Sequence, residues 1–156
     1  MPYNVHSVKF ILFQTMITIA IILSVWCAGF ADESPCTDAK QALTEGDRLR
    51  SWNALRRSYK LYAKCDDGAL AEGYSEAVAR ILVDRWSTLP RLALLAKDDD
   101  KFLHFVLKHV DATLDTNDLR TIRTRAQKQC PVGLGTLCND LGRRADSALK
   151  EAASPT

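Results

Sequence analysis

The chain has 156 residues, of which 47% are hydrophobic and 26% are charged. It carries 21 basic and 19 acidic side chains, which give a formal net charge of +2. This composition excludes intrinsic disorder and a collagen-like fibre, and the near-neutral charge favours neither nucleic acid nor an acidic substrate as a partner.

The first 31 residues have the layout of a secretory signal peptide. Residues 10–28 are apolar and uncharged, Lys9 precedes them, and small residues occupy positions 29 and 31, before Asp32. The sequence therefore predicts a signal peptide at 1–31, although the length of residues 10–28 also fits a retained inner-membrane anchor. Cleavage removes Cys27 from five cysteines and leaves an even number, as is usual in exported proteins. We expect a periplasmic or secreted location.

Residues 32–152 are expected to form a single all-α domain, because apolar residues recur at helical spacing and no stretch alternates like a β-strand. The pattern predicts a compact bundle of about six to seven short helices. Asp47 and Asp67 are the expected N-caps of the second and third helices, and Asp115 or Thr116 starts the sixth. The tail 153–156 is expected to fray. The predicted helices cover about 37–45, 47–65, 68–86, 90–96, 98–110, 115–130 and 137–152.

The four remaining cysteines allow three pairings. Cys130 and Cys138 bracket a loop rich in proline and glycine between two helix ends, so we expect them to pair. Cys36–Cys65 then joins the start of the first helix to the end of the second. With a turn at Gly46, however, the unequal helices leave these ends more than about 10 Å apart. The pairing therefore requires a later turn near 51–53 or a bend in the second helix; otherwise Cys36 has another partner.

No complete catalytic or metal-binding motif is present in the sequence. His104 lies four residues after Asp100 and is interpreted as a surface histidine that pairs with it. His109, with Asp111 near a helix end, is interpreted as a partner of the helix dipole. The acidic run 98–100 lacks the ligand pattern of an EF-hand. We therefore predict no catalytic residue, metal or cofactor.

Acidic residues gather around the turn before the third helix and along that helix. Paired carboxylates catalyse glycoside hydrolysis when one of them is held in an apolar pocket, and Tyr74 lies among these acids. An envelope enzyme that acts on glycan through carboxylates near Tyr74 is therefore an alternative function. A membrane-anchored structural subunit of the envelope is another, and it requires residues 10–28 to be retained.

The function that remains is binding. We expect a small exported protein-binding module, an inhibitor or immunity-type protein whose partner is another envelope or secreted protein, with no nucleic acid bound. Contact with a membrane requires residues 10–28, and the oligomeric state is open. In export signal, size, helicity and four cysteines, the chain resembles periplasmic immunity proteins that block cell-wall-degrading toxins. The candidate binding residues are Asp66, Asp67, Glu72, Glu76, Arg80 and Trp86.

Overall fold

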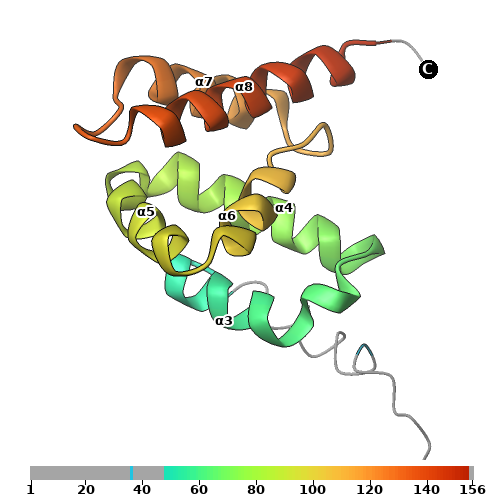
Figure 1. Cartoon of the computed structure of the whole chain (residues 1–156). Coiled ribbons are helices and arrows are strands. Elements are labelled where there is room, and N and C mark those ends of the chain that lie inside the picture. The colour runs from blue at the N-terminus through green and yellow to red at the C-terminus, as the bar shows by residue number, and fades with distance from the viewer. Residues whose placement is uncertain (1–35, 37–47, 155–156) are drawn as a thin grey trace, which may run out of the picture. The chain divides into compact units, whose positions relative to one another are not determined.

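The computed structural model describes Cys36 and residues 48–154, and helices are the only regular structure in this part of the chain (Figure 1). This confirms the predicted all-α class. The signal peptide, Cys27 and the expected helix at 37–45 lie outside the described residues. The elements are α3 (Trp52–Tyr62), the 3-10 turn η1 (Ala63–Cys65), α4 (Gly68–Asp84), the 3-10 turn η2 (Trp86–Thr88), α5 (Leu89–Asp98), α6 (Asp100–Lys108), α7 (Thr116–Lys128) and α8 (Gly135–Ala152).

Helix α3 begins at Trp52, five residues later than the expected start at Asp47. Ser51 is its N-cap, and the Ser51 hydroxyl accepts a hydrogen bond from the backbone N–H of Ala54 at 3.3 Å. Leu49 is 4% exposed although it precedes the helix. Leu49 fits the apolar spacing of the helix although it lies in an irregular segment. Helical spacing alone cannot tell such a buried segment from an extra turn of helix.

Helix α4 is the centre of the described fold, since it packs against both α3 and α7 (Figure 1). Asp67 is its N-cap, as predicted, and the Asp67 carboxylate accepts a hydrogen bond from Gly68 N–H at 2.7 Å. The apolar face expected from the sequence is buried. The buried residues of α4 are Leu70, Tyr74, Ser75, Ala77, Val78, Ala79, Ile81 and Leu82.

Helices α5 and α6 pack against each other and are separated by Asp99 alone. Pro90 lies in the first turn of α5. Backbone N–H groups at this position have no partner within the helix, so a proline there costs no hydrogen bond. Asp99 is the N-cap of α6, and its carboxylate accepts a hydrogen bond from Phe102 N–H at 3.1 Å. Helix α6 ends at Lys108, so His109 becomes its C-cap.

Helices α7 and α8 make the most extensive helix–helix contact of the described residues, and Figure 1 shows them side by side. Asp115 caps α7, as expected, while α8 begins at Gly135, two residues before the predicted start. Gly142 of α8 faces Ala126 of α7, and a Cβ added at Gly142 would make an ordinary van der Waals contact of 3.5 Å with Ala126 Cβ.

Both predicted disulfides are confirmed. The Cα atoms are 5.4 Å apart in Cys36–Cys65 and 6.0 Å apart in Cys130–Cys138. The later start of α3, after Ser51, agrees with the later turn that the first pairing requires. The two bridges are compatible with an extracytoplasmic location.

Within residues 48–154, no helix is long and apolar enough to cross a membrane.

Candidate functional site

The six residues expected to form a binding face lie on different parts of the surface. They extend from the turn before α4 to the turn after it, and α4 has 17 residues, a length of about 25 Å. Their exposure also differs. Asp67, Glu72 and Glu76 are exposed, Asp66 and Arg80 are partly buried, and Trp86 is buried.

Trp86 and Arg80 both have partners in the fold. Trp86 is 6% exposed, and its indole N–H donates a hydrogen bond to the backbone carbonyl of Gln129 at 2.8 Å. Arg80 lies 4.0 Å from the Glu76 carboxylate, the acid-before-base pair that the spacing predicts. Trp86 therefore joins the end of α4 to the end of α7 and offers little surface to a partner.

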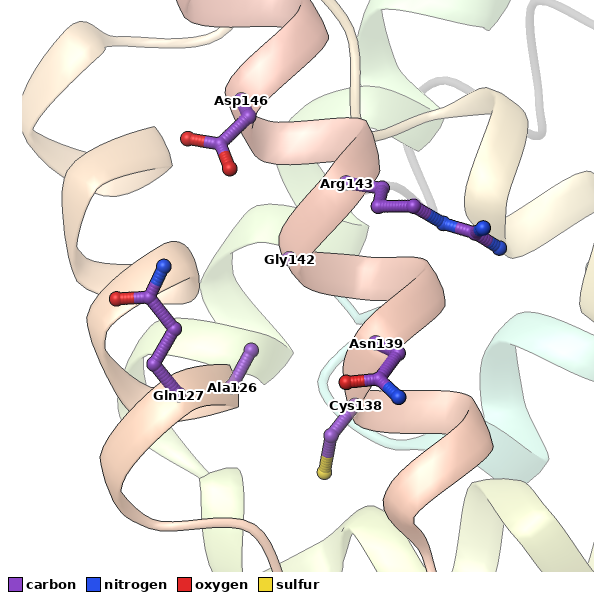
Figure 2. A pocket seen from close by; sticks show the side chains of 7 residues that line it. All are labelled: Ala126, Gln127, Cys138, Asn139, Gly142, Arg143 and Asp146. Atoms are coloured by element: carbon purple, nitrogen blue, oxygen red, sulfur yellow. The ribbon is translucent and has the colours of Figure 1, made fainter.

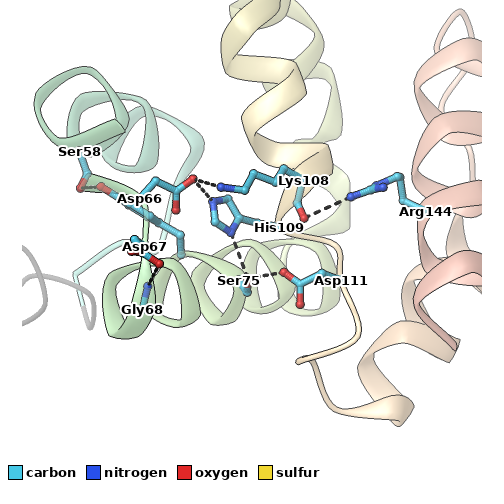
Figure 3. Close-up of polar contacts among 10 residues, drawn as sticks. Ser58, Asp66, Asp67, Gly68, Ser75, Lys108, His109, Asp111 and Arg144 are labelled. Carbon is cyan, nitrogen blue, oxygen red and sulfur yellow. Dashed lines mark hydrogen bonds and ion pairs between the residues drawn. The ribbon is translucent and has the colours of Figure 1, made fainter. Parts of the chain in front are cut away.

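Asp66 turns inward and links two elements (Figure 3). Its side chain is 8% exposed, and its Oδ2 accepts a hydrogen bond from Lys108 Nζ at 2.6 Å. The same oxygen lies 3.2 Å from His109 Nε2. Asp66 thus connects the turn before α4 to the carboxyl end of α6.

A buried chain of polar side chains continues from His109 (Figure 3). His109 Nδ1 is 3.0 Å from Ser75 Oγ, and the Ser75 hydroxyl donates to Asp111 Oδ2 at 2.7 Å. Ser75 is 2% exposed and His109 is 1% exposed. The interactions join α4 to the segment after α6. The His109 cluster is named here for its members Asp66, Ser75, Lys108, His109 and Asp111.

The direction of these hydrogen bonds follows from counting protons. A serine hydroxyl carries one hydrogen, and that of Ser75 is donated to Asp111. His109 Nδ1 must therefore carry the hydrogen of the bond to Ser75. Nε2 lies 3.2 Å from Asp66 Oδ2, and this contact favours a hydrogen on that nitrogen as well.

Burial is the largest influence on the pKa of His109. Burial lowers its pKa below the ordinary value of 6.5, and the Lys108 charge lowers it further, while Asp66 opposes them. Burial alone would raise the pKa of Asp111, but hydrogen bonds from Thr113 and Ser75 hold it below its ordinary value. An ionised Asp111 fits the hydrogen bonds that it accepts from Ser75 and Thr113.

The His109 cluster resembles a Ser-His-Asp relay in composition but not in chemistry. Nucleophilic catalysis requires the histidine to accept the serine proton, and the Ser75 proton goes to Asp111 instead. The serine oxygen is also closed off from solvent. The cluster therefore acts as a polar tie between α4 and the end of α6.

The suggested glycan site near Tyr74 has a similar obstacle. Tyr74 is completely buried, and its hydroxyl shares a hydrogen bond of 2.8 Å with Ser58. Burial raises the pKa of Tyr74, and the Ser58 hydrogen bond opposes this. Tyr74 packs against Phe105 with ring centroids 4.9 Å apart. The ring belongs to the core and lines no groove for a sugar among the described residues.

The sequence contains a signal that His109 points inward, although His109 is interpreted there as a partner of the helix dipole. Phe105 and Val106 lie three and four residues after Phe102, and His109 lies four and three residues after them, so His109 continues the buried stripe of α6. Ser75 has no comparable signal, because a serine within a helix usually faces solvent or bonds its own backbone.

Two surface cavities lie near the Cys130–Cys138 bridge. The first, of about 340 Å³, lies between α7 and α8, and Figure 2 shows Gln127 and Asp146 on its two sides. The second, named here the apolar groove, measures about 260 Å³. It lies among α5, α6 and the start of α8. Its lining residues are Ala93, Ala96, Lys97, Leu103, Gly133, Leu134, Thr136, Leu137 and Asp140.

No group of three or more His, Cys, Asp or Glu side chains in the described part of the chain is placed to hold a metal ion. The chain matches no protein-family model, and no curated protein or solved structure is similar enough to indicate a family.

Proposed function

We propose that this chain is an exported module that binds another protein, and that the contact is made at the apolar groove. The two disulfides support a location outside the cytoplasm. The His109 cluster does not have the proton arrangement of a nucleophilic enzyme, so binding accounts better for the described structure.

The observation that carries the proposal is the full exposure of the Val132 side chain, in the loop that supplies Gly133 and Leu134 to the apolar groove. Val132 precedes Gly133, a lining residue, and Leu94, which follows the lining residue Ala93, is 50% exposed. Among the described residues, only one other large apolar side chain, Leu61, is comparably exposed. Neighbouring exposed apolar residues at a groove are typical of protein contact sites.

The loop that presents Val132 is constrained before any partner arrives. The Cys130–Cys138 bridge closes it over a sequence separation of eight residues. Pro131 restricts its backbone, and Gly133 adopts a φ of 80°. A loop held in this way loses little conformational entropy on binding, which favours affinity.

The lining of the groove indicates what it binds. Its walls are mainly alanine and leucine, while Lys97, Thr136 and Asp140 supply one positive, one neutral polar and one negative group. Such a site suits an apolar side chain of a partner protein, surrounded by polar groups that can bond to either charge. The charges of Lys97 and Asp140 cancel, so the groove has no net charge that would attract a strongly charged ligand.

Site-specific photocrosslinking tests this proposal. A benzophenone side chain placed at Val132 in the exported full-length protein should crosslink to one envelope or secreted protein. The same side chain at Leu61, which is 68% exposed on α3, is the matched control and should not form that product. An identical set of products from both positions, or none from Val132, would overturn the proposal.

A further inference from the structure

The exposed face of α3 carries positive charge at helical spacing. Lys60 and Leu61 lie three and four residues after Arg57, and Lys64 of the adjoining turn η1 lies four and three residues after them. Side chains at these steps lie on the same face of a helix. All four are exposed, and Leu61 is 68% exposed. Arg57, Lys60, Leu61 and Lys64 are named here the α3 stripe.

The opposite face of α3 fixes the helix to the fold. Trp52, Leu55 and Ser58 are its buried residues. The Ser58 and Tyr74 hydroxyls share a hydrogen bond of 2.8 Å, which joins α3 to α4. Figure 1 shows α7 and α8 beyond α4, on the side away from α3. Helix α3 is therefore an outer helix of the described fold, and the α3 stripe faces away from the core.

The cations of the α3 stripe have no acidic partner in the described part of the chain. Helix α3 contains no Asp or Glu. Arg57, Lys60 and Lys64 make no ion pair or side-chain hydrogen bond with another described residue. Arg56 shows the contrast, because its guanidinium lies 3.7 Å from the Asp99 carboxylate on another flank of α3. Ion pairs within the described fold therefore do not cancel the charges of the stripe.

The acids that follow the stripe in the chain have other roles. The Asp66 carboxylate is bound to Lys108 Nζ at 2.6 Å and is almost completely buried. The exposed Asp67 accepts a hydrogen bond from Gly68 N–H as the N-cap of α4. Between residues 57 and 67, three unpaired cations thus stand against one exposed carboxylate, and this surface keeps an excess of positive charge.

We propose that the α3 stripe binds an anionic phospholipid surface. Such a surface attracts each Lys or Arg that approaches it and requires no matching shape. Leu61 then enters the boundary of the acyl chains, while the long stems of Lys60 and Lys64 keep their ammonium groups among the headgroups. An exposed leucine surrounded by cations suits this interface better than water.

A lipid surface fits the α3 stripe better than an acidic protein does. Protein contacts are dominated by apolar anchors that fill pockets, and the stripe lines neither of the two cavities described above. The inference is independent of the apolar groove, which is formed by other helices. It also requires no contact through residues 10–28, because the interacting side chains belong to α3 and η1.

Co-sedimentation with lipid vesicles tests the proposal, with the exported protein isolated in soluble form and at low ionic strength. Vesicles that contain phosphatidylglycerol should bind at least about tenfold more strongly than vesicles of phosphatidylcholine alone, and high salt should abolish the difference. Lys60→Gln combined with Lys64→Gln should weaken binding to the anionic vesicles about tenfold or more, because each cation near the surface contributes about fivefold.

A matched pair of substitutions separates the stripe from the net charge. Lys128→Gln combined with Lys150→Gln removes the same charge from exposed positions of α7 and α8 and should leave binding unchanged. Thermal unfolding should show that both double variants remain folded. A benzophenone side chain at Leu61 should attach to lipid in the anionic vesicles. Equal binding to the two kinds of vesicle, equal losses in the two double variants, or attachment at Leu61 to an acidic protein and not to lipid would overturn the proposal.

Discussion

His109 Nδ1 lies 3.0 Å from Ser75 Oγ, and this contact joins the cap of α6 to the middle of α4 across 34 positions of the sequence. Both side chains are almost completely buried. A buried polar group must keep its partner, because water cannot replace it. The contact therefore makes the position of the α6 carboxyl end depend on α4.

Replacement of Ser75 by alanine should destabilise the fold. Ser75→Ala leaves His109 Nδ1 and one Asp111 oxygen without their shared partner, so we expect a loss of about 1–3 kcal/mol in the free energy of unfolding. Urea denaturation measures this loss. Ser147→Ala, at an exposed position of α8, should change stability by less than about 0.5 kcal/mol. Equal effects at the two positions would show that the polar tie has no energetic role.

The stability of the protein should fall as the solution becomes mildly acidic. His109 has its ordinary pKa of 6.5 in the unfolded chain and a lower pKa in the folded protein. The unfolded chain therefore binds more protons as the pH falls below about 6.5, and the free energy of unfolding declines until the folded pKa is passed.

Urea denaturation between pH 7 and pH 5 measures this effect. His109→Gln should reduce the slope of stability against pH, whereas His104→Gln, at an exposed position of the same helix, should keep it. An unchanged slope in His109→Gln would contradict the assignment of the pH dependence to the buried ring.

The two charges beside His109 should shift its titration in opposite directions. Lys108 lowers the pKa of His109 and Asp66 raises it, so Lys108→Met should raise that pKa and Asp66→Asn should lower it. Nuclear magnetic resonance of the imidazole nitrogens can follow the titration of the folded protein. A shift of the same sign in both variants would be inconsistent with the electrostatic account.

Two neighbouring glycines should respond differently to alanine. Gly133 has a φ of 80°, so Gly133→Ala should cost about 1 kcal/mol although nothing lies within 4 Å of an added Cβ. Gly135 begins α8 without a positive φ, and Gly135→Ala should be neutral or stabilise by about 0.4–1 kcal/mol. Thermal unfolding compares the two, and a stabilising Gly133→Ala would refute the constrained loop.

The helical class, the caps of α4 and α7 and both disulfides could be predicted because they depend on local signals. Asp67 and Asp115 stand directly before the helices they cap, and Cys130 and Cys138 bracket a loop that ends two helices. Such signals survive in a single sequence, since each depends on residues only a few positions apart.

The candidate site could not be predicted in the same way because it depends on distant residues. Asp66 is a candidate binding residue by sequence, but its contacts with Lys108 and His109, more than 40 positions away, bury its side chain. The exposure of Val132 is likewise a property of the folded surface. An apolar residue in a sequence indicates burial far more often than a contact site.

The affinity of the protein that crosslinks through Val132 tests the central claim most directly. Surface plasmon resonance with the purified partner should show binding to the wild-type chain and at least tenfold weaker binding to Val132→Asp, because a buried, unpaired carboxylate opposes association. Leu61→Asp should bind as the wild type does. Equal affinities of Val132→Asp and the wild-type chain would contradict a protein contact at the apolar groove.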